Sequence, residues 1–281
     1  MVNKNGNIIE NEAASLSISN RGFAYGDALF ETIRVINGRI IFWEDHYFRL
    51  MASMRIMRME IPLNFSPEFL ETEIKNLVEE NGLSETAARV KLTVYRKEGG
   101  LYTPVTNDNE YLITATPLSE SFYLLNEDFY EVELFKDHYV TAGLLSTLKS
   151  NNRAVNILGS IYAKENDYDN CFLINEQKNV VEALNGNIFL VKDNVIKTPP
   201  LTDGCLKGIT RGKILEIAKK LPDYKIEEVS ISPFELQKAD EIFITNAVVG
   251  IQPVSKYRKK EYSHEVAKTL LGRLNTLARL N

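Results

Sequence analysis

The hairpin signal near the start of the chain is the feature that most constrains its fold. Residues 30–43 read FETIRVINGRIIFW, two apolar and β-branched runs on either side of Asn37-Gly38. This dipeptide favours a two-residue turn because Asn and Gly both accept a positive φ angle. We therefore expect a pair of antiparallel strands here.

Two helices are predicted directly after the hairpin. Residues 44–58 carry Phe48, Met51 and Met54 at helical spacing, and a second helix over residues 67–82 stops at Gly82. We expect both helices to lie on a sheet face. The strands ARVKLTVYR and EYLITATPL flank a polar loop at 97–108 and complete a mixed α and β half.

A Ser- and Glu-rich stretch at residues 118–126 is the predicted linker between two domains. The fold class is predicted to be α/β in the mixed α+β sense. The smaller domain covers residues 1–117 and the larger covers 127–281. The larger domain is expected to contain short strands, such as CFLINE and EIFITNA, and helices at 208–221, near 233–238 and near 263–279.

Composition excludes several classes of protein. With 281 residues and 44% hydrophobic content the chain can bury a sizeable core, and its net charge of −5 gives no basic field for nucleic acid. Cys171 and Cys205 are too few for a disulfide scaffold, and three His show no metal-ligand spacing. The polar N-terminus and the lack of an apolar run of about 20 residues argue against secretion or a membrane. We expect a cytoplasmic protein without a metal site.

Lys149 is the first candidate for chemistry. It lies in STLKSNNRAVNI, between two apolar stretches. Partial burial there would lower the pKa of its amine and free the neutral form that attacks a carbonyl. The alternative is a solvated lysine in a polar loop, which is the more common environment for lysine.

An arginine and a glutamate are the next candidates. Arg49 follows the apolar start of a predicted helix, and its guanidinium suits bidentate recognition of a phosphate. Glu182, in NVVEALNGNIFLV, is flanked by apolar residues, so it is a candidate buried carboxylate in need of a cationic partner, such as a protonated pyridine nitrogen. An exposed helix arginine and a strand-end glutamate facing solvent are the alternatives.

Three further segments have the composition of site walls. Ile209 and Thr210 begin a predicted helix after Gly208, where unpaired N–H groups attract anions, although a Thr there is often only a cap. The backbone around Asn246 and Ala247 offers a second set of donors, unless it is simply a strand leaving the sheet. The segment SISNRGFAYGDALFETIRV, which includes Tyr25 and Thr32, is either a site wall or a surface loop and strand.

These segments together resemble the class IV aminotransferase family, which includes branched-chain aminotransferases, D-amino-acid aminotransferase and aminodeoxychorismate lyase. The resemblance spans residues 20 to 254 and rests on the motifs R-G-x-x-Y-G-D, H-x-x-R-L, L-K-x-x-N, E-x-x-x-x-N-I-F and G-I-T-R in this order. It implies a two-domain fold, a homodimer, and pyridoxal 5′-phosphate (PLP) bound where the family places it, between its domains.

The resemblance also implies a role for each candidate. Lys149 binds the cofactor aldehyde as a Schiff base and later moves the substrate proton. Arg49 binds the cofactor phosphate, Glu182 pairs with the pyridine nitrogen, and Ile209 with Thr210 cradles the phosphate. Asn246 and Ala247 are the second set of phosphate donors.

Local departures guide the choice within the family. The Asn-Arg after Lys149, Thr32, and the TNA triplet at 245–247 are similar to aminodeoxychorismate lyases, whereas Leu101 stands where some lyases carry an arginine. The favoured function is therefore cleavage of 4-amino-4-deoxychorismate to pyruvate and 4-aminobenzoate, with Lys149 and Thr32 as catalytic residues. The substrate-binding candidates are Tyr25, Arg96, Tyr102 and Arg153.

Two alternatives stay open. One is transamination of a branched-chain L-amino acid or a D-amino acid with a 2-oxo acid. The other is a protein that holds PLP without turnover.

Overall fold

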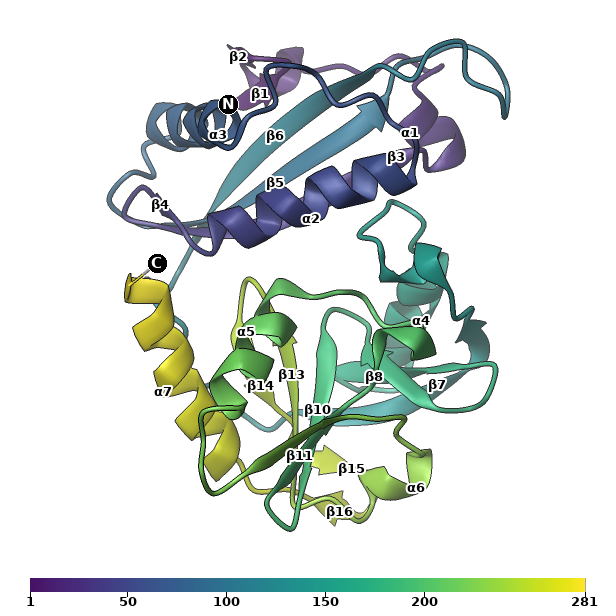
Figure 1. Ribbon diagram of the computed structural model, residues 1–281, viewed down its shortest axis with the longest axis vertical. Helices are drawn as coiled ribbons and strands as arrows, with labels where there is room; N and C mark the ends of the chain where they lie inside the picture. Colours follow the sequence, from purple (N-terminus) through teal and green to yellow (C-terminus); the bar gives the residue numbers. More distant parts are fainter. Residues whose placement is uncertain (281) are drawn as a thin grey trace. The chain divides into compact units, whose positions relative to one another are not determined.

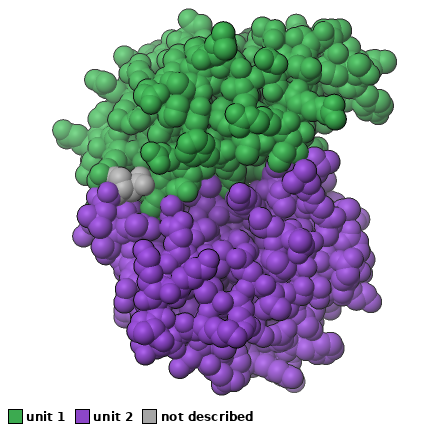
Figure 2. Space-filling view, viewed as in Figure 1, with its two compact units in different colours: residues 1–122, 149–152, 281 green, residues 123–148, 153–280 purple. Residues whose placement is uncertain are grey.

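The computed structural model describes residues 1–280, which form two compact units (Figure 2). Unit 1 consists of Met1–Phe122 together with Lys149–Asn152, and unit 2 of Tyr123–Leu148 and Arg153–Leu280. The chain first passes between the units at Phe122–Tyr123, inside the stretch predicted as a linker. Both units mix helices and strands, so the predicted fold class is confirmed.

Unit 1 is built on one six-stranded antiparallel sheet in the order β2-β1-β6-β5-β3-β4. Its long central strands, β3, β5 and β6, pair along nearly their whole lengths. The strands are β1 (Val2–Lys4), β2 (Asn7–Ile9), β3 (Ala28–Ile36), β4 (Arg39–Ile40), β5 (Ala87–Arg96) and β6 (Asn109–Leu118). The polar N-terminus thus supplies two short strands that its composition did not predict.

The predicted hairpin is confirmed. Strands β3 and β4 meet at Asn37 and Gly38, whose φ angles are 48° and 70°. Two positive φ angles give the turn the twist that flanking strands need. Strand β4 is short because the chain enters a helix soon after the turn.

Helices α2 (Trp43–Ile56) and α3 (Pro67–Glu80) pack on one face of this sheet (Figure 1). Ser66 caps α3 by accepting a hydrogen bond from the Phe69 amide, and Pro67 opens its first turn. Met51 and Met54 are buried as expected, but Phe48 is 62% exposed, and its ring lies against Tyr47 instead. A third, short helix, α1 (Arg21–Tyr25), precedes β3.

Alternation along β3 gives the two faces of the sheet different characters. Leu29, Ile33 and Val35 are at most 1% exposed on the face that α2 covers. Phe30 and Thr32 point to the opposite face, where they are half-buried. One face is therefore core, and the other is available for function.

Unit 2 contains two five-stranded sheets, in the orders β12-β11-β10-β13-β14 and β16-β15-β7-β8-β9. The strands are β7 (Glu131–Val140), β8 (Asn170–Asn175), β9 (Val180–Ala183), β10 (Asn187–Lys192), β11 (Val195–Thr198), β12 (Lys225–Glu228), β13 (Glu241–Asn246), β14 (Gly250–Pro253), β15 (Lys256–Tyr257) and β16 (Lys260–Glu261).

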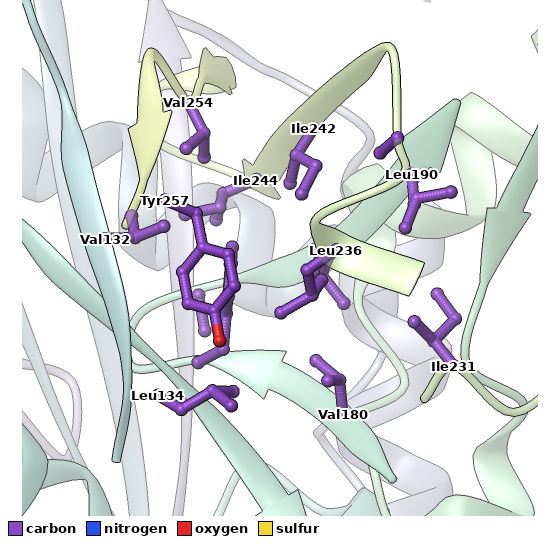
Figure 3. Close-up of a cluster of buried hydrophobic side chains, with 14 of the residues drawn as sticks. Val132, Leu134, Val180, Leu190, Ile231, Leu236, Ile242, Ile244, Val254 and Tyr257 are labelled. Carbon is purple, nitrogen blue, oxygen red and sulfur yellow. The ribbon is translucent and has the colours of Figure 1, made fainter. Parts of the chain in front are cut away.

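The core of unit 2 joins side chains from both sheets (Figure 3). Val132 and Leu134 come from β7, while Ile242 and Ile244 come from β13, and all four are at most 3% exposed. Tyr257 is fully buried among them. Apolar burial of this extent is the main stabilising contribution to the unit.

Four helices complete unit 2. Helices α5 (Ile209–Ala218) and α7 (Glu265–Leu280) pack on each other and on β13 (Figure 1), and α6 (Pro233–Leu236) is a single capped turn. Helix α4 (Ala154–Glu165) packs on β7 and β8. Among residues 1–280, no helix has both the length and the apolar content of a membrane span.

Helix α4 was not predicted, because its apolar residues do not form a single buried stripe. Only Gly159 and Ala163 are fully buried, whereas Ile157 and Ile161 are 59% and 48% exposed. A Cβ at Gly159 would lie 2.4 Å from the Leu184 side chain. Small residues therefore let α4 approach the sheet closely, and Val155 and Tyr162 pack beside them while Ile157 and Ile161 face outward.

Candidate active site

The main chain around Lys149 extends the sheet of unit 1. The Phe30 amide donates to the Lys149 carbonyl at 2.8 Å, and the Asn151 amide donates to the Ala28 carbonyl at 3.0 Å. The sequence analysis assigned this segment to the domain at 127–281, because of its position in the chain. In the structure, residues 149–152 belong to unit 1. Long-range strand pairing of this kind leaves no local pattern in the sequence.

The Lys149 side chain lies on the open face of that sheet. Its Nζ is 4.5 Å from the centre of the Phe30 ring, and Nζ of Lys91 is 4.8 Å from the same ring. Thr32 follows Phe30 on this face and pairs with Lys91 across the strands. Two amines and a hydroxyl are therefore gathered within one small area.

Lys91 is a site residue that sequence reasoning missed. It is half-buried, and burial, with a smaller contribution from Arg89, lowers its pKa. Within residues 1–280 it makes no ion pair with a carboxylate, and its amine lies over the Phe30 ring. The signal that could have identified it is a lysine at an open-face position in an otherwise apolar strand.

Arg49 belongs to a buried cluster on the opposite face of β3. Its Nε donates to Glu31 Oε1 at 2.8 Å and its Nη2 donates to Oε2, while His46 Nδ1 lies 2.7 Å from Oε2. Glu31 and His46 are 2% and 1% exposed, and the Arg49 side chain is 8% exposed. The alternative of an exposed helix arginine is therefore excluded for Arg49.

The charges of this cluster depend on one another. Burial by itself would raise the pKa of Glu31, but the Arg49 charge and hydrogen bonds from His46 and Arg49 outweigh it and lower that pKa to about 2. Burial lowers the pKa of His46, although Glu31 opposes this. Glu31 lies in the segment predicted as a possible site wall, but neither Glu31 nor His46 was given a role. An acid at a buried-face position of β3 is the signal that could have identified the cluster.

In unit 2, Glu182 is buried on β9, with 6% exposure. Its Oε2 accepts a hydrogen bond from the Leu206 amide at 2.8 Å. This hydrogen bond connects the carboxylate to the loop that precedes α5. The buried environment agrees with the proposal that Glu182 can receive a cationic group, since a buried carboxylate is stabilised by such a partner.

The start of α5 has the features of an anion site. Its N-cap is Gly208, where a Cβ would meet Asn187 Oδ1 at 2.0 Å, so Thr210 is not the cap. The Thr210 side chain is buried, and within the described chain its Oγ1 has no hydrogen-bond partner. An orphaned hydroxyl beside the unpaired amides of a ten-residue helix suits a phosphate group.

The turn after β13 is only partly available to a ligand. Asn246 Oδ1 accepts from the amides of Val248 and Val249 at 3.0 and 2.9 Å, and Tyr123 donates to the Ala247 carbonyl. Thr245, on the strand that α5 packs against, has a buried Oγ1 that also lacks a partner among residues 1–280. The Thr245 hydroxyl was not foreseen from sequence.

The structure brings three of the four substrate-binding candidates together. Tyr25, Arg96 and Tyr102 line a pocket of about 280 Å³ in unit 1, and the two tyrosine rings are 5.7 Å apart. Arg153 is not part of this pocket. It precedes α4, and its Nη2 donates to the Leu148 carbonyl at 2.8 Å.

Comparison with known proteins decides the family. The family model "Amino-transferase class IV" matches residues 28–257, more than half of the chain. The chain belongs to the class IV aminotransferase family. A Methanocaldococcus jannaschii protein provisionally named a branched-chain-amino-acid aminotransferase is 31% identical over 89% of this chain and 85% of its own length. The D-alanine aminotransferase of Listeria monocytogenes serotype 4b is 30% identical over the same shares.

Solved structures of class IV aminotransferases have the same fold. The branched-chain aminotransferase of Thermoproteus uzoniensis, solved with norvaline, superposes with a TM-score of 0.86 at 25% identity, covering 97% of this chain and 92% of its own. A Legionella pneumophila protein provisionally titled a 4-amino-4-deoxychorismate lyase has a TM-score of 0.83 at 23% identity, over 95% and 97% of the two chains.

Class IV aminotransferases are PLP-dependent enzymes, and the residues of this chain fit that cofactor. PLP carries a phosphate, an aldehyde and a pyridine nitrogen. The chain offers an orphaned hydroxyl at a helix N-terminus, a half-buried lysine and a buried carboxylate. The chain therefore offers a hydroxyl for the phosphate, an amine for the aldehyde and a carboxylate for the pyridine nitrogen.

The Glu31 cluster predicts a specific dependence of stability on pH. The pKa of Glu31 is lowered from 4.5 to about 2, so its ionised form stabilises the fold above pH 4.5, and this contribution is lost as pH falls from 4.5 to 2. A shift of this size corresponds to about 3 kcal/mol. The lowered pKa of His46 adds a loss of stability as pH falls below its ordinary value of 6.5.

Glu31→Gln should be less stable than the wild type at pH 7, because Arg49 stays buried without a counter-charge. The difference in unfolding free energy, measured by urea denaturation, should narrow as pH falls from 5.5 to 3.5. Parallel pH curves for the two proteins would contradict this account.

Proposed function

We propose that this enzyme is a PLP-dependent lyase that converts 4-amino-4-deoxychorismate to pyruvate and 4-aminobenzoate. The observation that carries the proposal is the shared face of Lys149, Thr32 and Lys91 in unit 1. A base, a hydroxyl donor and a cation without a carboxylate partner among the described residues suit elimination from a substrate with two carboxylates. The sequence around Lys149 and at residues 245–247 supports the same choice.

Several residues are proposed to hold the cofactor. Arg49, whose guanidinium is fixed by Glu31, and Ile209 with Thr210 bind its phosphate, assisted by the backbone at Asn246 and Ala247. Glu182 pairs with the pyridine nitrogen, and Lys149 binds the aldehyde. When bound, PLP supplies an electron sink for the carbon next to the substrate amino group.

The steps of the reaction are assigned to two side chains. Lys149 removes the proton from the ring carbon that bears the amino group, the C–O bond at the neighbouring ring carbon breaks, and the ring becomes aromatic. The enolpyruvate released takes up one proton at its CH2 carbon and becomes pyruvate. Thr32 donates a hydrogen bond on the leaving side. Both act from the open face of β3 and its edge, where the strand holds them at fixed spacing.

Lys91 is proposed to bind a substrate carboxylate. Its half-buried ammonium lacks an anionic partner among the described residues, and a carboxylate would compensate for its burial. The sequence assigned this role to Arg96, Tyr102 or Arg153. Arg96 is less suited, because its guanidinium is bound to Asp27, Asn107 and two carbonyl groups.

Transamination is the second candidate. The relatives at 30–31% identity are named as a D-alanine and a branched-chain aminotransferase, which favours it. A PLP-holding protein without turnover is the remote alternative, and the amine of Lys149 on the open sheet face argues against it.

A parallel assay of the PLP-loaded enzyme tests the reaction. We expect fast pyruvate release from aminodeoxychorismate, with little conversion of the cofactor to its amine form by L-leucine, D-alanine or L-glutamate. Thr32→Val should lower pyruvate release about 100-fold, because one hydrogen-bond donor to the developing charge on the leaving oxygen is lost, and Lys149→Ala should abolish it. Rapid cofactor conversion by one amino acid without pyruvate release would leave a transaminase, and turnover by Lys149→Ala would exclude both mechanisms.

Thr210 is expected to contribute to PLP affinity. Thr210→Val keeps the shape of the side chain but removes the hydroxyl, and losing a hydrogen bond to a charged group should raise the Kd for PLP about tenfold or more. Spectrophotometric titration of the apoenzyme measures this. Thr72→Val, which removes an exposed hydroxyl on α3, is the control and should bind PLP like the wild type. Equal affinities for Thr210→Val and the wild type would place the phosphate elsewhere.

We also propose that the enzyme is a cytoplasmic homodimer. Helix α4 leaves Ile157, Leu158 and Ile161 exposed on one face, at 59%, 43% and 48%, which suits a second copy of the chain. The two cysteines are free and buried, in keeping with a reducing compartment. Sedimentation equilibrium should give twice the mass of 32.0 kDa, and a monomer would contradict the dimer.

A further inference from the structure

Arg21 lies buried beneath the tip of the 97–108 loop. It is 3% exposed, at the start of α1. Its Nη1 donates to the carbonyls of Gly99 and Leu101, with a longer contact to Gly100 at 3.4 Å, and its Nη2 donates to the Tyr102 carbonyl at 3.3 Å. One guanidinium thus binds the main chain of four consecutive loop residues.

Asp27 couples Arg21 to the base of the same loop. Its Oδ2 accepts from Nε of Arg21 and from Nε of Arg96, each at 2.9 Å. Arg96 also donates to Asn107 Oδ1 at 2.7 Å and to the carbonyls of Met57 and Arg58. Both ends of the loop and its tip are therefore connected through one carboxylate.

The backbone of the tip is a tight turn. Gly100 has a φ angle of 75°, and a Cβ there would lie 2.1 Å from the Thr103 carbonyl oxygen. The side chains of the tip point outward, with Leu101, Tyr102 and Val105 exposed at 77%, 90% and 73%. A firmly held main chain thus presents three exposed side chains, of which the Tyr102 ring lies 5.7 Å from that of Tyr25.

We propose that Arg21 and Arg96, joined through Asp27, are positioning residues that fix the 97–108 loop so that Leu101, Tyr102 and Val105 form a preorganised apolar rim for the substrate. The inference rests on the proposed function. The rim contacts the apolar part of the substrate, away from the reacting carbon. Neither arginine touches substrate, because their donors are directed at protein acceptors.

Preorganisation determines which kinetic constant depends on Arg21. A loop that is already ordered loses little conformational entropy when substrate binds, so disordering it weakens binding. The reacting groups on the open face of β3 are separate from the loop and keep their geometry. Loss of Arg21 should therefore raise KM and leave kcat nearly unchanged.

The test compares Arg21→Met and Arg21→Lys with the wild-type holoenzyme. Lys97→Ala is the matched control, because it removes an exposed ion pair with Asp108, 3.4 Å long, at the base of the same loop. Hydrogen exchange, followed by mass spectrometry, reports the order of residues 98–106, and steady-state kinetics use the substrate that the wild type turns over in the parallel assay.

For Arg21→Met we expect about tenfold faster exchange in residues 98–106 and about a tenfold higher KM, equivalent to about 1.4 kcal/mol, with kcat within about threefold of the wild type. Arg21→Lys keeps the charge but not the planar fork of donors, so its exchange rate and its KM should lie between those of the wild type and Arg21→Met. Exchange in β3 and β5 should not change. Lys97→Ala should match the wild type throughout.

Three results would overturn the inference. They are unchanged exchange in the loop of Arg21→Met, faster exchange with an unchanged KM, and a fall in kcat accompanied by faster exchange in β3 and β5. If the wild type turns over none of the four substrates, the proposed function fails instead. The exchange comparison needs no substrate and then decides the claim about the loop.

Discussion

The buried charge of Glu31 is the constraint around which unit 1 is organised. A carboxylate beneath a helix is tolerated only when a cation and hydrogen-bond donors reach it, and α2 supplies the Arg49 guanidinium and the His46 imidazole. The register of α2 on β3 is thereby fixed, and so is the direction of the Arg49 guanidinium. Because β3 alternates, fixing Glu31 on the core side also fixes Phe30 and Thr32 on the open side.

The lysine is held by main-chain hydrogen bonds. Residues 149–152 pair with the start of β3, so the main chain of both segments sets the position of Lys149. The two sides of one strand thus carry different groups: the buried cluster of Glu31, His46 and Arg49 on one, and the amines of Lys149 and Lys91 over a shared ring on the other. Strand β3 therefore contributes to the position of both sets of groups.

Local patterns in the sequence predicted much of the fold. The Asn37-Gly38 turn and the helices α2 and α3 follow from local propensity and periodicity, and the structure confirms them. Helix α4 was not predicted because its apolar residues lie on both its buried and its exposed side and form no single stripe. In the candidate site, the residue types at Lys149, Arg49 and Glu182 were what the prediction rested on. The partners of Arg49 and the pairing of Lys149 with β3 come from segments far apart in the chain, and periodicity carries no information on such contacts.

The grouping of Lys149–Asn152 with the N-terminal unit has a consequence for folding during synthesis. The first 122 residues can form most of their sheet, but the edge of β3 at Ala28–Phe30 lacks its partner until residue 152 has left the ribosome. An unpaired edge is a site for wrong strand pairing. The segment that covers this edge also carries Lys149, so the same event that protects the edge brings the lysine to the Phe30 ring.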